Sequence, residues 1–319
     1  GHGMSKEDLL LSIKRHATSK IITQEDLEHI MTYGFRGEAL ASISAVSLLE
    51  MRTKTEADEL GWKLTSDPLN DVQLEPANTE VGTQILVKNL FYNVPARRKF
   101  LKSDITEFRY ISDTMMKLAI SRPDVRFTFY DDDAMIFDVH PANQEQRISE
   151  ILGSNTKGNL IRIEHENEFV RIEGFVGMPH LSKQNSVHQY FFLNGRSIQN
   201  KSLSHAVFSA YEHLLEKNYK PMFVVNIMID PELVDINVHP QKHEVKFEDE
   251  RLIYNSIRKA VNSALAENNL TPDIMIQSKE VTSPFEVMNI QSETGQNERV
   301  MVNRMTGEIL DNNRPMGGG

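Results

Sequence analysis

The sequence has no cysteine, a single tryptophan and no long hydrophobic run. Without cysteine, nothing suggests a disulfide-stapled secreted protein. The longest apolar stretches, such as residues 222–229, are far shorter than the about 20 residues that a membrane helix needs. No basic-then-apolar signal segment opens the chain. We therefore expect a cytoplasmic protein, associated with the nucleoid if it binds DNA, and no membrane span.

Positive charge is also in deficit, with 35 Lys and Arg against 45 Asp and Glu and a formal net charge of −10. This balance argues against a protein coated in nucleic acid, but it does not exclude a local basic groove. An apolar content of 39% and a charged content of 25% are typical of a soluble globular protein. At 319 residues the chain is long enough for two domains.

The most informative stretch is a glycine-containing segment just before an apolar helical run. It consists of Gly34, Phe35, Arg36, Gly37, Glu38, Ala39 and Leu40. Two glycines around an arginine let the backbone approach a ligand and turn its N–H groups one way, and a following helix would add its positive end. Thr18, Ser19 and Lys20 could add hydroxyls and an ammonium to the same phosphate seat. On local chemistry alone, an ordinary loop between two helices is the simpler interpretation.

Four runs in a fixed order point beyond local chemistry. They are RHATSKI at 15–21, GFRGEALASISAVS at 34–47, VGTQILVKNLFYNVPARRKFL at 81–101 and VDINVHPQKHEVKF at 234–247. Together they resemble the motifs of the MutL family, DNA mismatch repair ATPases of the superfamily that also holds gyrase, heat-shock chaperones and histidine kinases. The resemblance spans roughly residues 1–265.

The resemblance implies an α+β fold: a truncated Bergerat-type ATPase sandwich, a mixed sheet with helices, followed by a ribosomal-protein-like β-α domain. We place a partial ATP-binding domain at 1–122 and a transducer domain at 123–268. The polar segment 269–319 is expected to be a disordered linker.

The function that the resemblance implies is an ATP-dependent, DNA-binding clamp that couples mismatch recognition to downstream repair enzymes. Its ligands would be ATP and Mg²⁺. Its partners would be DNA without sequence preference, a mismatch-recognition protein, a repair nuclease or helicase, and a second copy in an ATP-dependent dimer. The endonuclease motif of some relatives lies outside the matched region, so no nicking is expected.

The opening residues Gly1-His2-Gly3-Met4 have two interpretations. They could be a purification-tag scar, or they could be the end of an Asp-x-Gly-x-Gly-Met motif, in which Gly1 and Gly3 would contact nucleotide. On the second interpretation, the family's adenine-binding Asp, water-activating Glu and Mg²⁺-holding Asn have no counterpart in this sequence. We then expect no ATP turnover, and the alternative function is a non-enzymatic DNA-binding or partner-docking fragment.

Two further positions are assigned to the nucleotide by resemblance. Thr83 lies where the family places a hydroxyl near the nucleotide, although a lone strand threonine is ordinarily structural. Lys242 matches a lysine that reaches from the second domain to the γ-phosphate. The neighbouring His239 and His243 resemble a zinc pair, but Pro240 between them disfavours the helical geometry that such a pair needs.

Cations at two places are candidates for DNA contact. Arg196 follows an Asn-Gly pair that predicts a hairpin turn, and the resemblance implies a phosphate contact for it. Arg97 and Arg98, which with Lys99 follow Pro95, would oppose a helix dipole unless an anion lies nearby. A solvated basic face explains them equally well. The acidic triplet at 131–133 is interpreted as a solvated turn and not as a metal site.

Periodicity predicts the remaining elements. Helices are expected at 7–15, from 95 onward through 118, at 144–152, at 200–216 and at 249–266. Strands are expected at 47–53, 62–66, 81–87, 126–130, 135–139, 161–164, 171–176, 189–193 and 222–229. The last of these is almost wholly apolar, which predicts a central strand covered on both faces.

Overall fold

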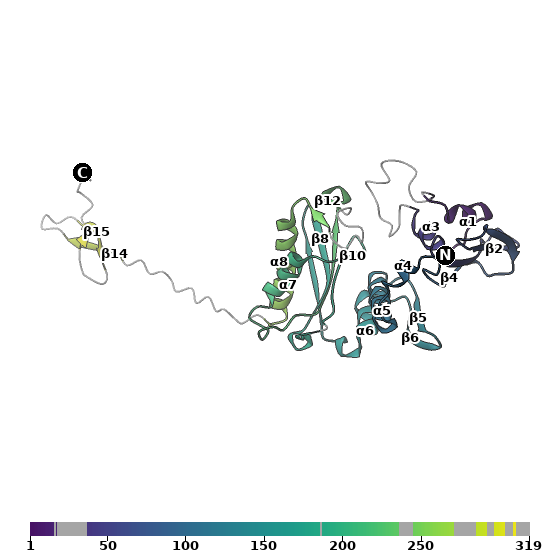
Figure 1. Ribbon diagram of the computed structural model, residues 1–319. Coiled ribbons are helices and arrows are strands. Elements are labelled where there is room, and N and C mark those ends of the chain that lie inside the picture. Colours follow the sequence, from purple (N-terminus) through teal and green to yellow (C-terminus); the bar gives the residue numbers. More distant parts are fainter. Residues whose placement is uncertain are drawn as a thin grey trace. The chain divides into compact units, whose positions relative to one another are not determined.

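The computed structural model describes residues 1–15, 17, 37–185, 187–235 and 245–270, together with strands at 285–291, 297–303 and 309–310. Residues 1–271 form one compact unit and residues 272–319 a second. The described part is α+β, as predicted, with antiparallel and mixed sheets and packed helices (Figure 1). None of its helices has the length and apolar character that crossing a bilayer requires.

The first sheet has four antiparallel strands in the order β3-β2-β1-β4. They are β1 (Leu48–Lys54), β2 (Gly61–Ser66), β3 (Gln73–Ala77) and β4 (Gly82–Lys88). Alternate side chains of β1 are buried, as expected for a strand with one face toward a core. Helices α1 (Lys6–Ser12) and α3 (Ala39–Ser44) pack on this sheet. Their small core contains Leu9, Leu49, Met51 and Leu64.

Ser5 caps the N-terminus of α1. Its hydroxyl accepts from the Asp8 N–H at 3.1 Å and donates to the Asp8 carboxylate at 2.9 Å. The helix ends at Ser12 and not at Arg15, and Ile13 beyond it still packs against the core of the sheet. Cap and sheet contact thus fix the direction in which the N-terminal segment enters the fold.

The connection after β4 is strained and tightly held. Asn89 and Phe91 have positive φ angles of 54° and 62°, and the Phe91 N–H donates to the Val46 carbonyl at 2.7 Å. The Tyr92 hydroxyl donates to Asp67, which lowers the pKa of Asp67 and raises the pKa of Tyr92 to about 12. These contacts join the loop to two turns of the sheet.

Two helices then follow where one was expected. Pro95 opens α4 (Pro95–Arg98) at its first turn, as predicted, but α4 is a single turn. Residues 99–103 separate α4 from α5 (Asp104–Ser121), and Ser103 is the N-cap residue of α5. The hairpin of β5 (Phe127–Asp131) and β6 (Ala134–Val139) comes next, with the acidic triplet at its turn.

Helix α6 (Gln144–Leu152) has the predicted bounds, and Gly153 caps its C-terminus. Its Arg147 side chain is fully buried and donates to the carbonyls of Ala119, Arg122, Pro123, Val125 and His140 at 2.7–3.1 Å. The guanidinium therefore joins α6 to the end of α5 and to both ends of the β5–β6 hairpin. These contacts cross the boundary predicted at 122/123, so that division stays a prediction.

The second sheet has five strands in the order β10-β9-β11-β8-β7. They are β7 (Leu160–Glu166), β8 (Val170–Gly177), β9 (Gln189–Leu193), β10 (Arg196–Ile198) and β11 (Phe223–Ile229). Strand β11 runs parallel to β9 and antiparallel to β8, so the apolar strand is central as predicted. Helices α7 (Lys201–Ala210) and α8 (Glu250–Glu267) pack against each other, and α8 lies on β7 and β8.

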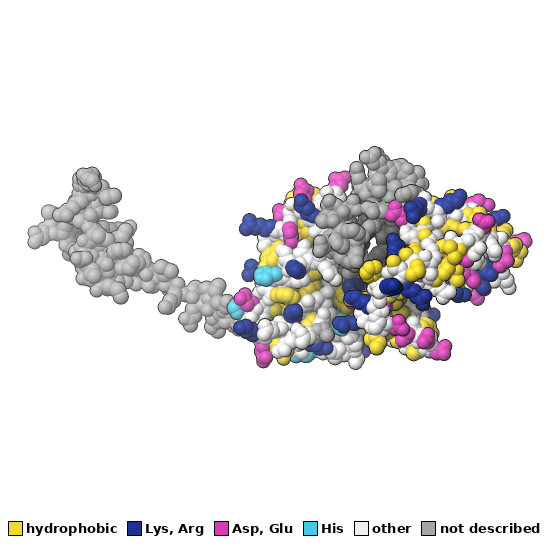
Figure 2. Space-filling view, in the orientation of Figure 1, with side chains coloured by type: hydrophobic (Ala, Val, Ile, Leu, Met, Phe, Trp, Pro, Cys, Tyr) yellow, Lys and Arg dark blue, Asp and Glu magenta, His cyan; other side chains and the backbone are white. Residues whose placement is uncertain are grey.

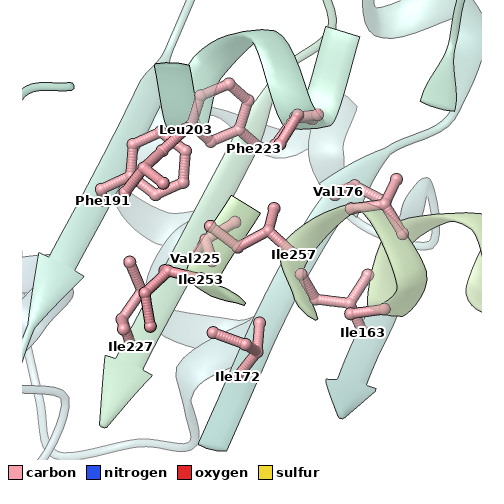
Figure 3. Packing of buried hydrophobic residues seen from close by; sticks show 14 of the residues in the cluster. Ile163, Ile172, Val176, Phe191, Leu203, Phe223, Val225, Ile227, Ile253 and Ile257 are labelled. Carbon is pink, nitrogen blue, oxygen red and sulfur yellow. The ribbon is translucent and has the colours of Figure 1, made fainter. Parts of the chain in front are cut away.

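The main core lies between this sheet and the two helices. Phe191, Phe223, Val225 and Ile227 meet Leu203 of α7 and Ile253 and Ile257 of α8 there (Figure 3). The opposite face buries Tyr190, Phe192 and Val224 against Ile120 of α5 and Ile148 of α6. Helix α7 is shorter than predicted, because the chain turns at Tyr211, whose buried hydroxyl donates to the Gly177 carbonyl at 2.6 Å.

Short elements complete the chain. The 3-10 turns are Ser154–Thr156, Pro179–Leu181 and Pro231–Leu233, and β12 (Val234–Asp235) pairs with β13 (Lys246–Phe247). In the second unit, β14 (Phe285–Gln291), β15 (Asn297–Asn303) and β16 (Ile309–Leu310) form an antiparallel sheet. The fading periodicity of this segment had predicted no strand.

Candidate functional site: a nucleotide cradle on the first sheet

The N-terminal segment crosses the end of β1 with almost no clearance. A Cβ atom added to Gly3 would lie 1.9 Å from the Lys54 carbonyl oxygen, and Gly3 has a φ angle of +79°. Both facts require glycine at this position. The next residue, Met4, donates its N–H to the Thr53 hydroxyl at 2.8 Å. The predicted nucleotide residue Gly3 is thus fixed against the sheet.

Thr53 is the hub of this end of the sheet. It lies on β1 directly opposite Thr83 of β4 and is fully buried. Its hydroxyl donates to the Gly82 carbonyl at 2.8 Å and lies 3.0 Å from the Thr83 hydroxyl. Sequence reasoning singled out Thr83 but not Thr53. The sequence signal for Thr53 is its position: it is a polar residue on the same face of β1 as the buried Leu49 and Met51.

The surface next to Thr83 is apolar. Ile85 and Val87 lie on the same face of β4, opposite Met51 and Leu49, and their side chains are 46% and 45% exposed. Within the described residues β4 is an edge strand. Figure 2 shows hydrophobic side chains and cations side by side over the part of the molecule that holds β4 and α4. An exposed apolar strand face beside backbone glycines suits a flat heterocyclic base.

Gly37, the part of the predicted phosphate loop next to α3, lies close to the backbone of Ala17. Gly37 has a φ angle of +61°, and a Cβ there would lie 2.1 Å from the Ala17 carbonyl oxygen, so glycine is required. Glu38 precedes α3, whose Ala39 and Leu40 form its first turn. Thr18, Ser19, Lys20, Gly34, Phe35, Arg36 and Lys242 lie outside the described residues, as do His239 and His243.

Arg196 lies where the Asn-Gly pair predicted it, at the start of β10. Asn194 and Gly195 have positive φ angles of 46° and 84°, as a two-residue hairpin turn requires. The Asn194 side chain also donates to the Ile229 carbonyl at 2.8 Å and accepts from its N–H at 3.1 Å. These bonds hold the turn, and with it Arg196, to the end of β11. No pattern in the sequence predicted them.

Arg97 and Arg98 lie at the end of the short helix α4, and both are exposed. Because α4 is a single turn, its first and last turns coincide and few peptide dipoles are aligned in it. The dipole conflict expected from the sequence is therefore small. Exposed hydrophobic residues follow closely, with Phe100 84% and Ile105 85% exposed.

The structure thus brings Gly1, Gly3 and Thr83 together. Arg196 lies on the second sheet. Among the described residues there is no group of three acidic or histidine side chains placed to hold a metal ion. The assignment of each residue to nucleotide or DNA stays a prediction.

A family model described as "DNA mismatch repair protein, C-terminal domain" matches residues 148–266. This region runs from α6 through the second sheet to α8. Over these residues the chain therefore resembles DNA mismatch repair proteins.

Curated relatives identify the family. The chain is 40% identical over 93% of its length to a "DNA mismatch repair protein MutL" of Christiangramia forsetii, and 40% identical over 92% of its length to that of Flavobacterium psychrophilum. It covers 48% of each relative. The chain therefore belongs to the MutL family and spans about half the length of the curated relatives that it matches.

Solved structures agree on the fold. A structure titled "Crystal Structure of N terminal domain of a DNA repair protein" matches with a TM-score of 0.70 at 20% identity, over 85% of this chain and 84% of that one. The "Aquifex aeolicus MutL ATPase domain complexed with ADP" matches with a TM-score of 0.52 at 24% identity, over 75% of this chain and 81% of that one. The predicted fold class is confirmed.

Proposed function

We propose that this chain is part of an ATP-dependent, DNA-binding switch of DNA mismatch repair. Its first sheet contributes to the nucleotide site, and Arg196 of the second sheet contacts DNA together with Arg97 and Arg98 of α4. Family membership supports this function, and the observation that carries it is the hydrogen-bond hub at Thr53. That hub joins two segments that resemble nucleotide motifs although 49 residues separate Met4 from Thr53 and 30 separate Thr53 from Thr83.

The chemistry of the described residues fits a nucleotide. The backbone of Gly1–Gly3 and the Thr83 hydroxyl offer hydrogen-bonding groups, and Ile85 and Val87 offer an apolar surface for a base. The resemblance assigns the phosphates to the loop that ends at Gly37 and to Lys242. Bound ATP with Mg²⁺ would supply an energy-rich phosphoanhydride.

For DNA, the role proposed for Arg196 is contact with phosphate, which positions the duplex without reading its sequence. Arg97 and Arg98 are proposed to extend this contact. The proposed partners are a mismatch-recognition protein, a downstream nuclease or helicase, and a second copy of the chain in an ATP-dependent dimer.

Titration of the chain with a non-hydrolysable ATP analogue and Mg²⁺, followed by calorimetry, tests the nucleotide part. We expect saturable binding that Thr83→Val weakens about fivefold, the value of one neutral hydrogen bond. Thr128→Val is the matched control, because Thr128 bonds to Asp138 on the β5–β6 hairpin. DNA binding without nucleotide binding would favour the alternative function, a non-enzymatic DNA-binding or partner-docking fragment.

A further inference from the structure

We propose that the groove between helix α8 and the edge strand β7 binds an extended peptide segment of a partner protein, and that this segment carries acidic side chains. The groove has a volume of about 420 Å³, which is within the range of ligand sites. Its residues belong to the second sheet and to α8, so the proposal does not depend on the nucleotide site.

Helix α8 has one flank toward α7 and the other over β7. On the first flank, the Tyr254 hydroxyl lies 2.9 Å from Nδ1 of His205 in α7. At about 100° per residue, Ser256 and Lys259 are on the opposite flank, and both line the groove. His165 of β7 faces them across the groove. The groove therefore lies along β7, which is the last strand of the described sheet.

The groove carries positive charge that the described part of the chain does not neutralise. Arg251 and Lys259 line it, and within the described residues neither side chain makes a hydrogen bond or an ion pair. Burial, followed by the charge of Lys259, lowers the pKa of His165, and no described carboxylate opposes this shift. Arg251 also lies in the first turn of α8, where a cation opposes the helix dipole. A ligand with negative charge would satisfy both cations.

The other groups in the groove favour a peptide over a chain of phosphates. Asp249 adds a carboxylate, which accepts the Leu252 N–H at 2.9 Å and would repel successive phosphates. The Asn255 amide has no hydrogen-bond partner among the described residues. Because an amide both donates and accepts, it can pair with a peptide group.

The edge of β7 offers backbone groups to the same ligand. The Asn167 N–H donates to the Val170 carbonyl at 3.0 Å, at the end of the ladder between β7 and β8. Bonding to a neighbour alternates along an antiparallel strand, so Arg162 and Glu164 direct their N–H and C=O groups away from β8. No described strand pairs with this edge. An extended peptide can therefore add to it as a further strand.

The two cations set a spacing for the acidic side chains of the ligand. Arg251 and Lys259 are eight residues apart on α8, or about 12 Å along the helix axis. Side chains four residues apart on one face of an extended strand are separated by about 13 Å. We therefore expect two acidic residues with three residues between them, both on the strand face toward α8.

Fluorescence anisotropy with the whole 319-residue chain and the labelled peptide Thr-Glu-Val-Thr-Val-Glu-Thr tests the proposal. We expect this peptide to bind about tenfold more tightly than the same peptide with Gln in place of both Glu residues. Arg251→Gln and Lys259→Gln should each weaken its binding about fivefold or more. Both side chains are exposed, so both variants should fold.

Arg258→Gln is the matched control. Arg258 is an exposed cation of the same helix, but it does not line the groove. Its substitution should change the affinity less than about twofold.

Hydrogen exchange gives a readout that is specific for strand addition. The amides of Arg162 and Glu164 point away from β8, so they should exchange more slowly when the Glu peptide is bound. The Gln peptide at the same concentration should protect them less.

Three results would overturn the proposal. The first is equal binding of the two peptides, or no binding of either at millimolar concentration. The second is peptide binding that Arg251→Gln and Lys259→Gln leave unchanged. The third is a loss of affinity in these variants for a short DNA duplex but not for the peptide, which would make the groove a DNA contact.

Discussion

At the scale of single residues, the buried Arg147 guanidinium carries the clearest energetic consequence. Its bonds to carbonyls of the α5 end and the hairpin satisfy groups that would otherwise be buried without donors. Arg147→Met keeps most of the side-chain volume but leaves these carbonyls unpaired. We expect it to lower the free energy of unfolding by about 3 kcal/mol or more, measured by urea denaturation.

Arg162→Met is the matched control for this substitution. Arg162 is an exposed residue of β7 with an ion pair to Glu164 at 3.2 Å, and such pairs contribute less than about 1 kcal/mol. Similar losses in the two variants would contradict the role given to Arg147.

His188 makes stability depend on pH. Its ring lies 3.2 Å from the Tyr190 hydroxyl, and burial, followed by the charge of Lys183, lowers the pKa of His188, while Asp113 opposes the shift. The unfolded chain therefore takes up this proton first as the pH falls below about 6.5, and the fold loses stability there. Between pH 7.5 and 5.5, the free energy of unfolding measured by urea denaturation should fall less in His188→Gln than in wild type. A pH dependence in His188→Gln equal to that of wild type would contradict this role of His188.

At the scale of elements, the β9–β10 hairpin depends on one side chain. Asn194 supplies a positive φ angle and two hydrogen bonds to the Ile229 backbone. Asn194→Ala should lower the free energy of unfolding by about 2 kcal/mol in urea denaturation. Asn70→Ala, in an exposed turn where Asn70 bonds to Asp67, should cost under about 1 kcal/mol. If Asn194→Ala cost no more than Asn70→Ala, the turn would be held by its backbone alone.

At the scale of the whole molecule, the net charge of −10 opposes DNA, so binding must depend on local cations. Arg196→Glu should weaken binding to all duplex sequences alike and reduce the slope of log affinity against log salt by about one. Arg162→Glu makes the same charge change on the edge strand β7 and should alter the slope less. A salt slope that Arg196→Glu leaves unchanged would remove Arg196 from the DNA contact.

Local patterns predicted elements well where one physical signal dominated. The bounds of β9 and of α6 agree with the prediction, and β11 is central as its apolar run indicated. Strand β3 was not predicted, because Pro76 and its polar neighbours carry no strand pattern. Its place at the edge of the sheet explains why a proline is tolerated there.

By itself, the sequence determined the α+β class, the family and most helix and strand positions, since these follow from periodicity, turn chemistry and ordered motifs. Tertiary structure decided which residues meet. Thr53 looked like an ordinary strand residue until the register placed it opposite Thr83 and the N-terminal segment placed Met4 above it. No sequence pattern singled out Arg147, and its burial follows from five carbonyls that only the packed fold brings together. The reason is physical: periodicity reports which face of an element is buried, whereas hydrogen-bond partners far apart in the chain are fixed only when the elements pack.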